Sequence, residues 1–425
     1  MLDRTTPPSV ATFSDITLHP EEIITLPNSA ELHIVNKGSL PLSRLSILWN
    51  GGTLDYPSKT ALRVMAATIT EGTKHMSGAE MADFIDFCGA RIAGDASSHF
   101  TSIQMASINS RFCELLPLIG GMASVADFPE NAVEATAKRM SAQRALQFEK
   151  VSWRASHQFC NLMRGLGHPA SKTTLPSDYE SVDRDMVLSA YDIFCKSPFH
   201  IFVGGAVDAK MVNEISLTFG KATPIQILPI NIIPYQPEDP SRTHIDMPDA
   251  KQSAVTMGMP AISRSHPDYI PLRLAIIGLG GYFGSRLMAN IREEKGLTYN
   301  ISASLSGTHE GAYIEIDAQC DAKYVDKVIE ETIKEIRNLR HNPPRGNELE
   351  RLRLHAWSSL ATAADSAFGT LEHYITHLRV GTPEGYFENQ LQAIASLSPE
   401  TIARVAEEYL APEQLTVVTA GSTKC

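Results

Sequence analysis

The feature that most constrains the fold is an internal duplication. The segment Leu45–Pro57 has the pattern of a strand that runs into a polar loop, and Val255–Pro267 repeats this pattern. A helical pattern follows each segment, over residues 58–71 and 268–278. Several positions match at one constant offset: Pro57 with Pro267, Leu62 with Leu272, and Arg63 with Arg273. These matched positions predict one structural unit that occurs twice.

The ends of the two halves also match. Residues 183–197 and 398–410 have the pattern of capped helices, and Ser398 followed by proline and glutamate is a favourable helix start. Each helix leads into a predicted closing strand, Phe199–Gly205 in the first half and Leu415–Gly421 in the second. The repeat therefore extends over both complete halves.

Periodicity within the units predicts an α+β fold. Residues 90–108 and 297–319 alternate as hairpin strands do, whereas residues 114–150 and 322–363 follow the helical period. We expect two homologous α/β-sandwich domains, each with a mixed, mainly antiparallel sheet packed with helices.

The domain boundaries follow from proline content. A chain of 425 residues is too long for one ordinary core. We predict an N-terminal domain over residues 1–221, an extended linker over 222–243 and a C-terminal domain over 244–425. The linker carries five prolines: Pro224, Pro229, Pro234, Pro237 and Pro240.

Composition excludes some partners. The formal charge of −11 argues against nucleic acid and anionic membrane surfaces, which both require clustered cations. No segment is apolar enough to span a bilayer or to act as a signal peptide. The six cysteines show no Cys-x-x-Cys spacing, which is typical of free thiols in a reducing compartment. We therefore expect a cytoplasmic protein.

The most informative candidate residues are Arg292 and Tyr299. The pattern places Arg292 in the last turn of a helix, Gly296 at the helix end and Tyr299 on the next strand. A cation and a phenol held on rigid elements are suited to polarising a carbonyl or to holding a carboxylate. Both residues also have a structural interpretation, as a helix C-terminal cation and a tyrosine at the core edge.

The repeated unit, together with the pattern Gly-Gly-Tyr-Phe-Gly-Ser-Arg-Leu and Arg-x6-Tyr over residues 280–299, resembles a known family. It is similar to the pitrilysin/insulinase-type zinc metallopeptidases (inverzincins). Within them it is most similar to the short-chain branch that contains the mitochondrial processing peptidase and paired bacterial subunits. The resemblance covers residues 20–422.

The resemblance also locates a zinc site that this chain lacks. Catalytic members carry His-x-x-Glu-His on a first-half helix, just before a Gly-Thr pair, and those positions fall here on Arg63, Ala66 and Ala67. The third ligand of the family is a glutamate on a later helix. The matching stretch, 135–148, contains no acidic residue, and Gln143 lies near the expected position. We predict no metal ligand and no cofactor in this chain.

The resemblance implies a role for the second half. Arg292 and Tyr299 correspond to the pair with which that half completes a composite site for peptide hydrolysis. We therefore expect a zinc-less subunit of a heterodimeric peptidase, whose partner is a homologous catalytic subunit with the zinc and whose substrate is a peptide. The alternative is a structural or peptide-binding pseudopeptidase with no catalytic role. The respiratory-complex core subunits of this family are the model for this alternative. Residues 92–98 correspond to the edge strand that active relatives offer to substrate.

Two further motifs have structural interpretations. His373 and His377 are spaced i, i+4, but no acidic residue lies between them and no third ligand is apparent. The run Gly278–Gly284 lacks the Gly-x-Gly-x-x-Gly pattern and follows a helix. We therefore expect a turn between two helices here and not a dinucleotide site.

Overall fold

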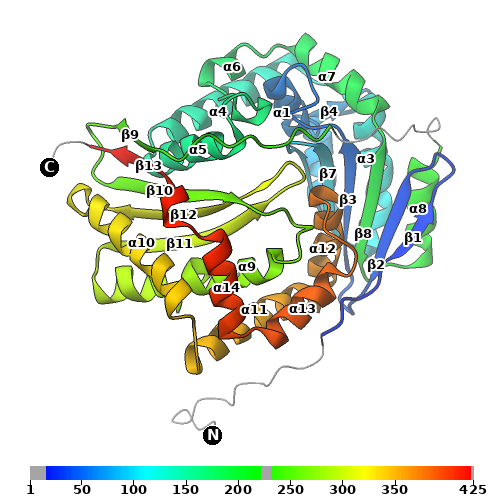
Figure 1. The fold of residues 1–425 in the computed structure, drawn as a ribbon. Helices are drawn as coiled ribbons and strands as arrows, with labels where there is room; N and C mark the ends of the chain where they lie inside the picture. The colour runs from blue at the N-terminus through cyan, green and yellow to red at the C-terminus, as the bar shows by residue number, and fades with distance from the viewer. Residues whose placement is uncertain (1–15, 222–230, 423–425) are drawn as a thin grey trace, which may run out of the picture.

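The computed structural model describes residues 16–221 and 231–422 (Figure 1). The strands of the first half are β1 (Glu22–Thr25), β2 (Glu31–Asn36), β3 (Leu42–Asn50), β4 (Gly72–Thr73), β5 (Met76–Ser77), β6 (Arg91–Ala96), β7 (Phe100–Ile108) and β8 (Phe199–Gly205). Its helices are α1 (Lys59–Ala67), α2 (Gly78–Phe87), α3 (Asn109–Val125), α4 (Glu130–Phe148), α5 (Val151–Arg164), α6 (Pro176–Glu180), α7 (Arg184–Lys196) and α8 (Ala209–Phe219).

The second half has the same kinds of element. Its strands are β9 (Arg242–Asp246), β10 (Ser253–Ala261), β11 (Thr298–Gly307), β12 (Ala312–Cys320) and β13 (Thr416–Gly421). Its helices are α9 (Tyr269–Ile276), α10 (Val325–His341), α11 (Asn347–Asp365), α12 (Ala367–Val380), α13 (Tyr386–Ser396) and α14 (Pro399–Tyr409). Two π-helical segments cover Ile277–Gly281 and Met288–Glu294.

The large sheets of the two halves share a strand order. The first sheet runs β1-β2-β8-β3-β7-β6 and the second runs β11-β12-β10-β13-β9. Read from opposite ends, β2-β8-β3-β7-β6 corresponds to β9-β13-β10-β12-β11. The pairs β2/β8 and β13/β9 are parallel and the other pairs are antiparallel. The duplicated α+β fold, with a mixed and mainly antiparallel sheet in each half, is confirmed.

The helix starts follow local chemistry. The Asp183 carboxylate accepts a hydrogen bond from the Met186 N–H at the start of α7, and the Ser398 hydroxyl accepts one from the Thr401 N–H at the start of α14. Helix α1 is shorter than its pattern predicts. It ends at Thr68, whose hydroxyl bonds back to a carbonyl of the last turn and whose backbone leaves the helical region.

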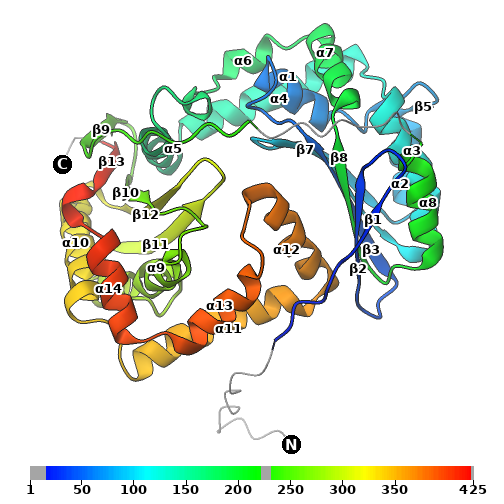
Figure 2. The same ribbon diagram turned by 45° about the vertical axis from the view of Figure 1, so that its right-hand side comes forward.

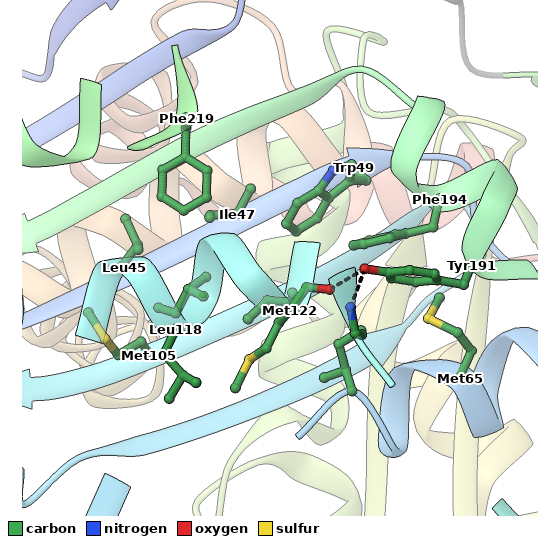
Figure 3. Packing of buried hydrophobic residues seen from close by; sticks show 14 of the residues in the cluster. Leu45, Ile47, Trp49, Met65, Met105, Leu118, Met122, Tyr191, Phe194 and Phe219 are labelled. Atoms are coloured by element: carbon green, nitrogen blue, oxygen red, sulfur yellow. Dashed lines mark hydrogen bonds between the residues drawn. The ribbon is translucent and has the colours of Figure 1, made fainter. Parts of the chain in front are cut away.

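One face of the first sheet packs against helices of its own half. Figure 3 shows Trp49 of β3 and Phe194 of α7 in this core, with ring centroids 4.4 Å apart. The Tyr191 hydroxyl donates to the Met122 carbonyl at 2.9 Å and accepts from the Ala126 N–H at 2.8 Å. This tyrosine therefore joins α7 to the end of α3 inside the core.

The other face of the first sheet is covered by a helix from the second half. Helix α12 packs on β8 and β2 (Figure 2), where Leu371 lies in one cluster with Leu48 and Phe202. A Cβ on Gly204 of β8 would lie only 3.1 Å from the Leu371 side chain. Because both of its faces are buried, β8 has a nearly continuous apolar sequence and does not alternate.

The second sheet is covered in the reciprocal way. Helix α5 of the first half packs on β10 and β13 (Figure 2), and its fully buried Phe159 lies against Ala254 and Val418. A Cβ on Gly258 of β10 would lie 2.7 Å from the Phe159 ring. Each half therefore gives one helix to the sheet of the other half, and neither sheet has its full cover without the other half.

The connection between the halves is extended where it is described. Residues 231–241 have no helix or strand, and β9 begins at Arg242, inside the segment predicted as linker. The Tyr235 N–H donates to the Glu310 carbonyl, and the Gln236 N–H donates to the Arg164 carbonyl. The connection is thus held against both halves. Part of the predicted linker, residues 222–230, lies outside the described residues.

Two sequence-based expectations concern membranes and disulfides. Within residues 16–221 and 231–422, no helix is both long and apolar enough to cross a membrane. The cysteines of the same residues are free thiols: Cys88, Cys113, Cys160, Cys195 and Cys320. Cys425 lies outside the described residues.

The exchanged helices predict a shared stability of the halves. Phe159→Ala should lower the free energy of unfolding by about 3–5 kcal/mol, because it leaves a cavity between α5 and the second sheet. Phe87→Ala is the matched control, since Phe87 is 68% exposed, and it should cost less than about 1 kcal/mol. Urea denaturation followed by circular dichroism measures both values, and equal losses would contradict the expectation.

Candidate functional site

The helix that corresponds to the zinc-binding helix of the family is α1. Its N-cap is Ser58, whose hydroxyl accepts from the Ala61 N–H at 3.2 Å. Arg63 is half-buried and donates from Nη1 to the Tyr179 hydroxyl at 3.3 Å, while Ala66 is buried. The sequence-predicted positions therefore present a guanidinium and two methyl groups, none of which can bind zinc or activate water.

The backbone of α1 lies directly against an edge strand. A Cβ on Gly94 of β6 would lie 2.1 Å from the Ala66 carbonyl oxygen, so only glycine allows this approach. Strand β6 forms the edge of the first sheet and holds most of residues 92–98. Residues 92–98, which the resemblance compares with the substrate edge of active relatives, therefore lie mostly on an edge strand, beside α1.

The resemblance assigns the third zinc ligand to the region of Gln143, which carries an amide and not a carboxylate. Gln143 lies on α4 and is exposed. Its neighbour Arg144 is half-buried and lies over the Trp153 ring, 5.5 Å from the centroid. Helix α4 therefore places the Arg144 guanidinium near Lys59 of α1, where, in addition to burial, its charge contributes to lowering the pKa of that lysine.

A cationic cavity lies beside this face of α1. Its volume is about 410 Å³, and its lining comes from both halves and from the connecting segment. Four lining residues are cations: Lys59, Arg63, Arg164 and Arg379. The Nε atoms of Arg164 and Arg379 are buried and make no hydrogen bond. Buried guanidinium donors of this kind are suited to carboxylate or phosphate oxygens.

Ionisation in and around the cavity reflects this clustered positive charge. Burial, and then the charges of Arg63, Lys172 and Arg144, lower the pKa of Lys59. Burial and the nearby cations Arg144 and Arg164 lower the pKa of His157 to about 4. His157 is therefore neutral at pH 7, and an anion that enters the cavity would offset repulsion among the remaining cations.

One acidic residue among the described lining residues is paired across the two halves. Glu310, in the β11–β12 turn, contacts the His99 ring in the β6–β7 turn, and both side chains are almost fully buried. Burial opposes the charged form of Glu310, but hydrogen bonds from His99 and Thr308 bring its pKa down to about 2. This contact joins the two halves at the wall of the cavity.

Arg292 and Tyr299 lie on the elements that the sequence predicts. Arg292 is in the last turn of the π-helical segment, Gly296 has a φ of 60°, and Tyr299 is on β11. The Arg292 guanidinium stacks over the Phe283 ring at 4.9 Å, and Tyr299 is 84% exposed. Among the described residues, neither of the pair lines the cationic cavity and no hydrogen bond joins them.

Tyr299 borders a second cavity, of about 480 Å³, between α5 and the second sheet. Asp317 lines it and accepts from the Thr256 hydroxyl at 2.6 Å. Glu315, two residues away on the same face of β12, accepts from the Ser156 hydroxyl at 2.6 Å. Burial and the charge of Asp317 raise the pKa of Glu315 to about 7. The cavity beside Tyr299 therefore has carboxyl groups near it, whereas the first cavity has four cations in its lining.

The two motifs with structural interpretations behave as expected. His377 Nδ1 lies 2.6 Å from the Thr382 hydroxyl, whereas the His373 ring packs edge-on against Phe387. In the described part of the chain, neither histidine belongs to a group of three potential ligands. The glycine run forms a π-helical turn and a bend between two helices.

The sequence patterns did not indicate the cationic cavity. Arg164 ends α5, Arg379 lies on α12, and His99 and Glu310 lie in turns of opposite halves. No short motif links residues so far apart in sequence. The duplication could have provided a signal, because it matches the β6–β7 turn with the β11–β12 turn, but it does not show that the two turns meet.

Part of the chain matches a known protein family. Residues 184–354, less than half of the chain, match the family model described as "Peptidase M16 inactive domain". The chain is therefore similar to this family over these residues. At the positions that the resemblance assigns to the zinc-binding motif, this chain has Arg63, Ala66 and Ala67.

Individual relatives agree with this assignment. The uncharacterized zinc protease YmxG of Bacillus subtilis is 20% identical over 70% of this chain and 72% of its own length. The crystal structure of a peptidase M16 inactive domain from Pseudomonas fluorescens has a TM-score of 0.82 and 19% identity, over 95% of this chain and 98% of that one. The periplasmic protease PqqL from Escherichia coli has a TM-score of 0.78 and 14% identity, over 99% of this chain but 49% of PqqL.

The buried pair across the halves predicts a pH dependence. The folded-state pKa of Glu310, about 2, lies below its ordinary value of 4.5, so ionised Glu310 stabilises the fold above about pH 4.5. This stabilisation is lost as the pH falls toward 2. In thermal unfolding from pH 7 to pH 2, Glu310→Gln should lower the melting temperature most above pH 5, and the difference from wild type should shrink toward pH 2.

The exposed Glu384→Gln variant, between α12 and α13, is the control, and its melting temperature should follow wild type at every pH. A wild-type advantage over Glu310→Gln that stays constant down to pH 2 would contradict the assignment of an ionised Glu310.

Proposed function

We propose that this chain is the zinc-less subunit of a heterodimeric M16-type peptidase, to which it contributes Arg292 and Tyr299. The partner in this proposal is a homologous chain that carries His-x-x-Glu-His, and the substrate is a peptide. The observation that carries the proposal is the face of α1. Lys59 and Arg63 lie one turn apart on it, and Ala67 and Ala66 occupy the positions that the resemblance assigns to the second histidine ligand and the general-base glutamate. Such a face repels a metal cation.

The exposure of the Arg/Tyr pair supports a role at an interface. A tyrosine that is 84% exposed loses the packing energy that a buried ring would gain, so its hydroxyl is free to bind a ligand or a partner chain. A guanidinium stacked on the Phe283 ring keeps its in-plane N–H donors available. Both groups can therefore donate hydrogen bonds to a carbonyl oxygen that gains negative charge during hydrolysis.

The size of a related protease supports a partner of similar fold. The present chain aligns over 49% of PqqL, which therefore contains additional structure of about the same length. Two chains of the present size would supply an equivalent amount of structure as a dimer.

In the proposed complex, the zinc of the partner supplies the Lewis acid for peptide hydrolysis. The present chain supplies hydrogen-bond donors, through Arg292 and Tyr299, and a cationic cavity. The cavity would hold carboxylate groups of the peptide through Arg164 and Arg379, whose Nε donors are unpaired. The edge strand β6 offers backbone groups to an extended peptide.

The first test uses the isolated chain. Because α1 has no general base and no ligand, the purified protein should cleave no peptide from a fluorogenic library, with or without added zinc. Hydrolysis that requires zinc and persists through purification of the isolated chain would refute the proposal. The readout is turnover, so metal uptake elsewhere in the molecule does not affect it.

The second test uses the complex with its catalytic partner, obtained by co-purification or from a neighbouring gene that encodes the zinc motif. Tyr299→Phe or Arg292→Ala should lower kcat by about 100-fold, the usual effect of losing one oxyanion donor, without preventing assembly. Arg337→Ala is the control for a lost surface guanidinium and Tyr324→Phe for a lost hydroxyl. Unchanged turnover in Tyr299→Phe and Arg292→Ala would show that the pair has a structural role and does not contribute to catalysis.

One observation favours a second candidate function. Arg292 and Tyr299 do not line the cationic cavity, so the cavity can bind an anionic peptide segment without them. In that case the chain would be a peptide-binding pseudopeptidase with no catalytic role. Peptide binding by the isolated chain that is weakened by Arg379→Gln, with no effect of Tyr299→Phe on turnover by the complex, would favour this alternative.

A further inference from the structure

A group of potential metal ligands lies on the first sheet, on strands β2 and β8. These parallel strands pair Glu31 with His200, and His33 follows Glu31 by two residues. Alternate residues of a strand share a face, so the three side chains project from the same side of the sheet. Val35 and Phe202 continue that face under α12, which places the group at the edge of the surface covered by the exchanged helix.

The donor atoms of these side chains converge. Glu31 Oε2 lies 3.6 Å from His33 Nε2 and 3.4 Å from His200 Nδ1, and the three donor atoms all lie within 4.8 Å of one another. A zinc ion at about 2.0–2.1 Å from tetrahedral ligands separates each pair of them by about 3.3–3.4 Å. The distances from Glu31 Oε2 to the two histidine nitrogens are therefore already close to the ligand–ligand spacing around tetrahedral zinc.

Ordinary hydrogen bonding leaves these nitrogens unsatisfied. Distances of 3.4 and 3.6 Å exceed the usual N–H···O range, and His33 Nε2 and His200 Nδ1 are both buried without a hydrogen-bond partner. Unpaired buried polar atoms are costly, so native proteins rarely keep two of them side by side. A shared cation would satisfy both nitrogens and the carboxylate together.

A second carboxylate orients one of the imidazoles. Glu21 Oε2 lies 2.9 Å from His33 Nδ1, on the opposite side of the ring from Nε2. The Phe202 ring stacks on His33 at 4.3 Å and holds the ring plane. A hydrogen bond from Nδ1–H to Glu21 leaves the Nε2 lone pair directed at Glu31 and His200. This carboxylate–histidine arrangement is typical behind metal ligands.

The group is accessible from solvent. Glu31 is 47% exposed, so the group is open to solvent on one side and can admit an ion.

We propose that Glu31, His33 and His200 form a binding site for a divalent transition-metal ion, with zinc as the expected occupant. Two imidazoles and one carboxylate are borderline ligands that suit zinc, and three protein ligands leave one position for water. The ion would join β2 to β8 and, through Glu21, the segment before β1. This site lies on other elements than α1 and is independent of the proposed peptidase role. It departs from the sequence-based prediction of no metal ligand.

The experiment uses the full chain, freed of metal with a chelator and titrated with zinc chloride in a calorimeter. We expect one zinc ion per chain. His33→Gln, His200→Asn and Glu31→Gln should each weaken binding by more than about 100-fold, and Glu21→Gln by about 10–100-fold. Cobalt(II) should give the visible absorption of a four-coordinate site in the wild type and in none of the three ligand variants.

The double variant His373→Gln/His377→Gln is the matched control, because it removes two imidazoles from α12 and leaves the proposed ligands intact. It should bind zinc as the wild type does. Melting temperatures without metal show that each variant is folded, and zinc should raise them in the wild type and the control but in none of the three ligand variants. Absence of zinc binding by the folded wild type, or binding that survives His33→Gln and His200→Asn, would overturn the proposal.

Discussion

The exchange of α5 and α12 is the packing constraint on which the rest of the structure depends. A sheet with two apolar faces needs cover on both, and each half provides only one layer from its own helices. The second layer comes from the other half, through Phe159 on the second sheet and Leu371 on the first. The two halves therefore form one interlocked body, and groups from distant parts of the chain are held at fixed distances.

The same constraint creates the electrostatic character of the site. A protein of net charge −11 has a cavity lined by four cations, because the ends of α5 and α12 meet α1 there. Burial lowers the pKa of Lys59 most, and the charges of neighbouring cations such as Arg63 lower it further, because charges interact more strongly in such a half-buried space than in water. Helix α1 thus contributes cations to the cavity, at a place where the resemblance to zinc peptidases would lead one to expect metal ligands.

Local sequence patterns were sufficient for most of the fold. Helix caps such as Asp183 and Ser398, hairpin alternation and the repeat itself depend on neighbours along the chain, and each is found in the structure. The missing zinc motif was equally accessible, because its ligands are spaced i and i+4 on one helix. The end of α1 was less predictable, because the back-bond from Thr68 competes with continuation of the helix.

The sequence by itself determined the duplication, the hairpin and closing strands of each half, and the chemical inability of Arg63, Ala66 and Ala67 to hold zinc. These are properties of residue type and short-range spacing. Only the tertiary structure decided that α5 and α12 each pack on the sheet of the other half and that four cations line one cavity. It also decided that Glu31 and His33 lie beside His200 on a neighbouring strand. Parallel strand pairing and helix exchange bring together segments that are far apart along the chain. A local sequence pattern does not specify which distant apolar surfaces will pack against each other.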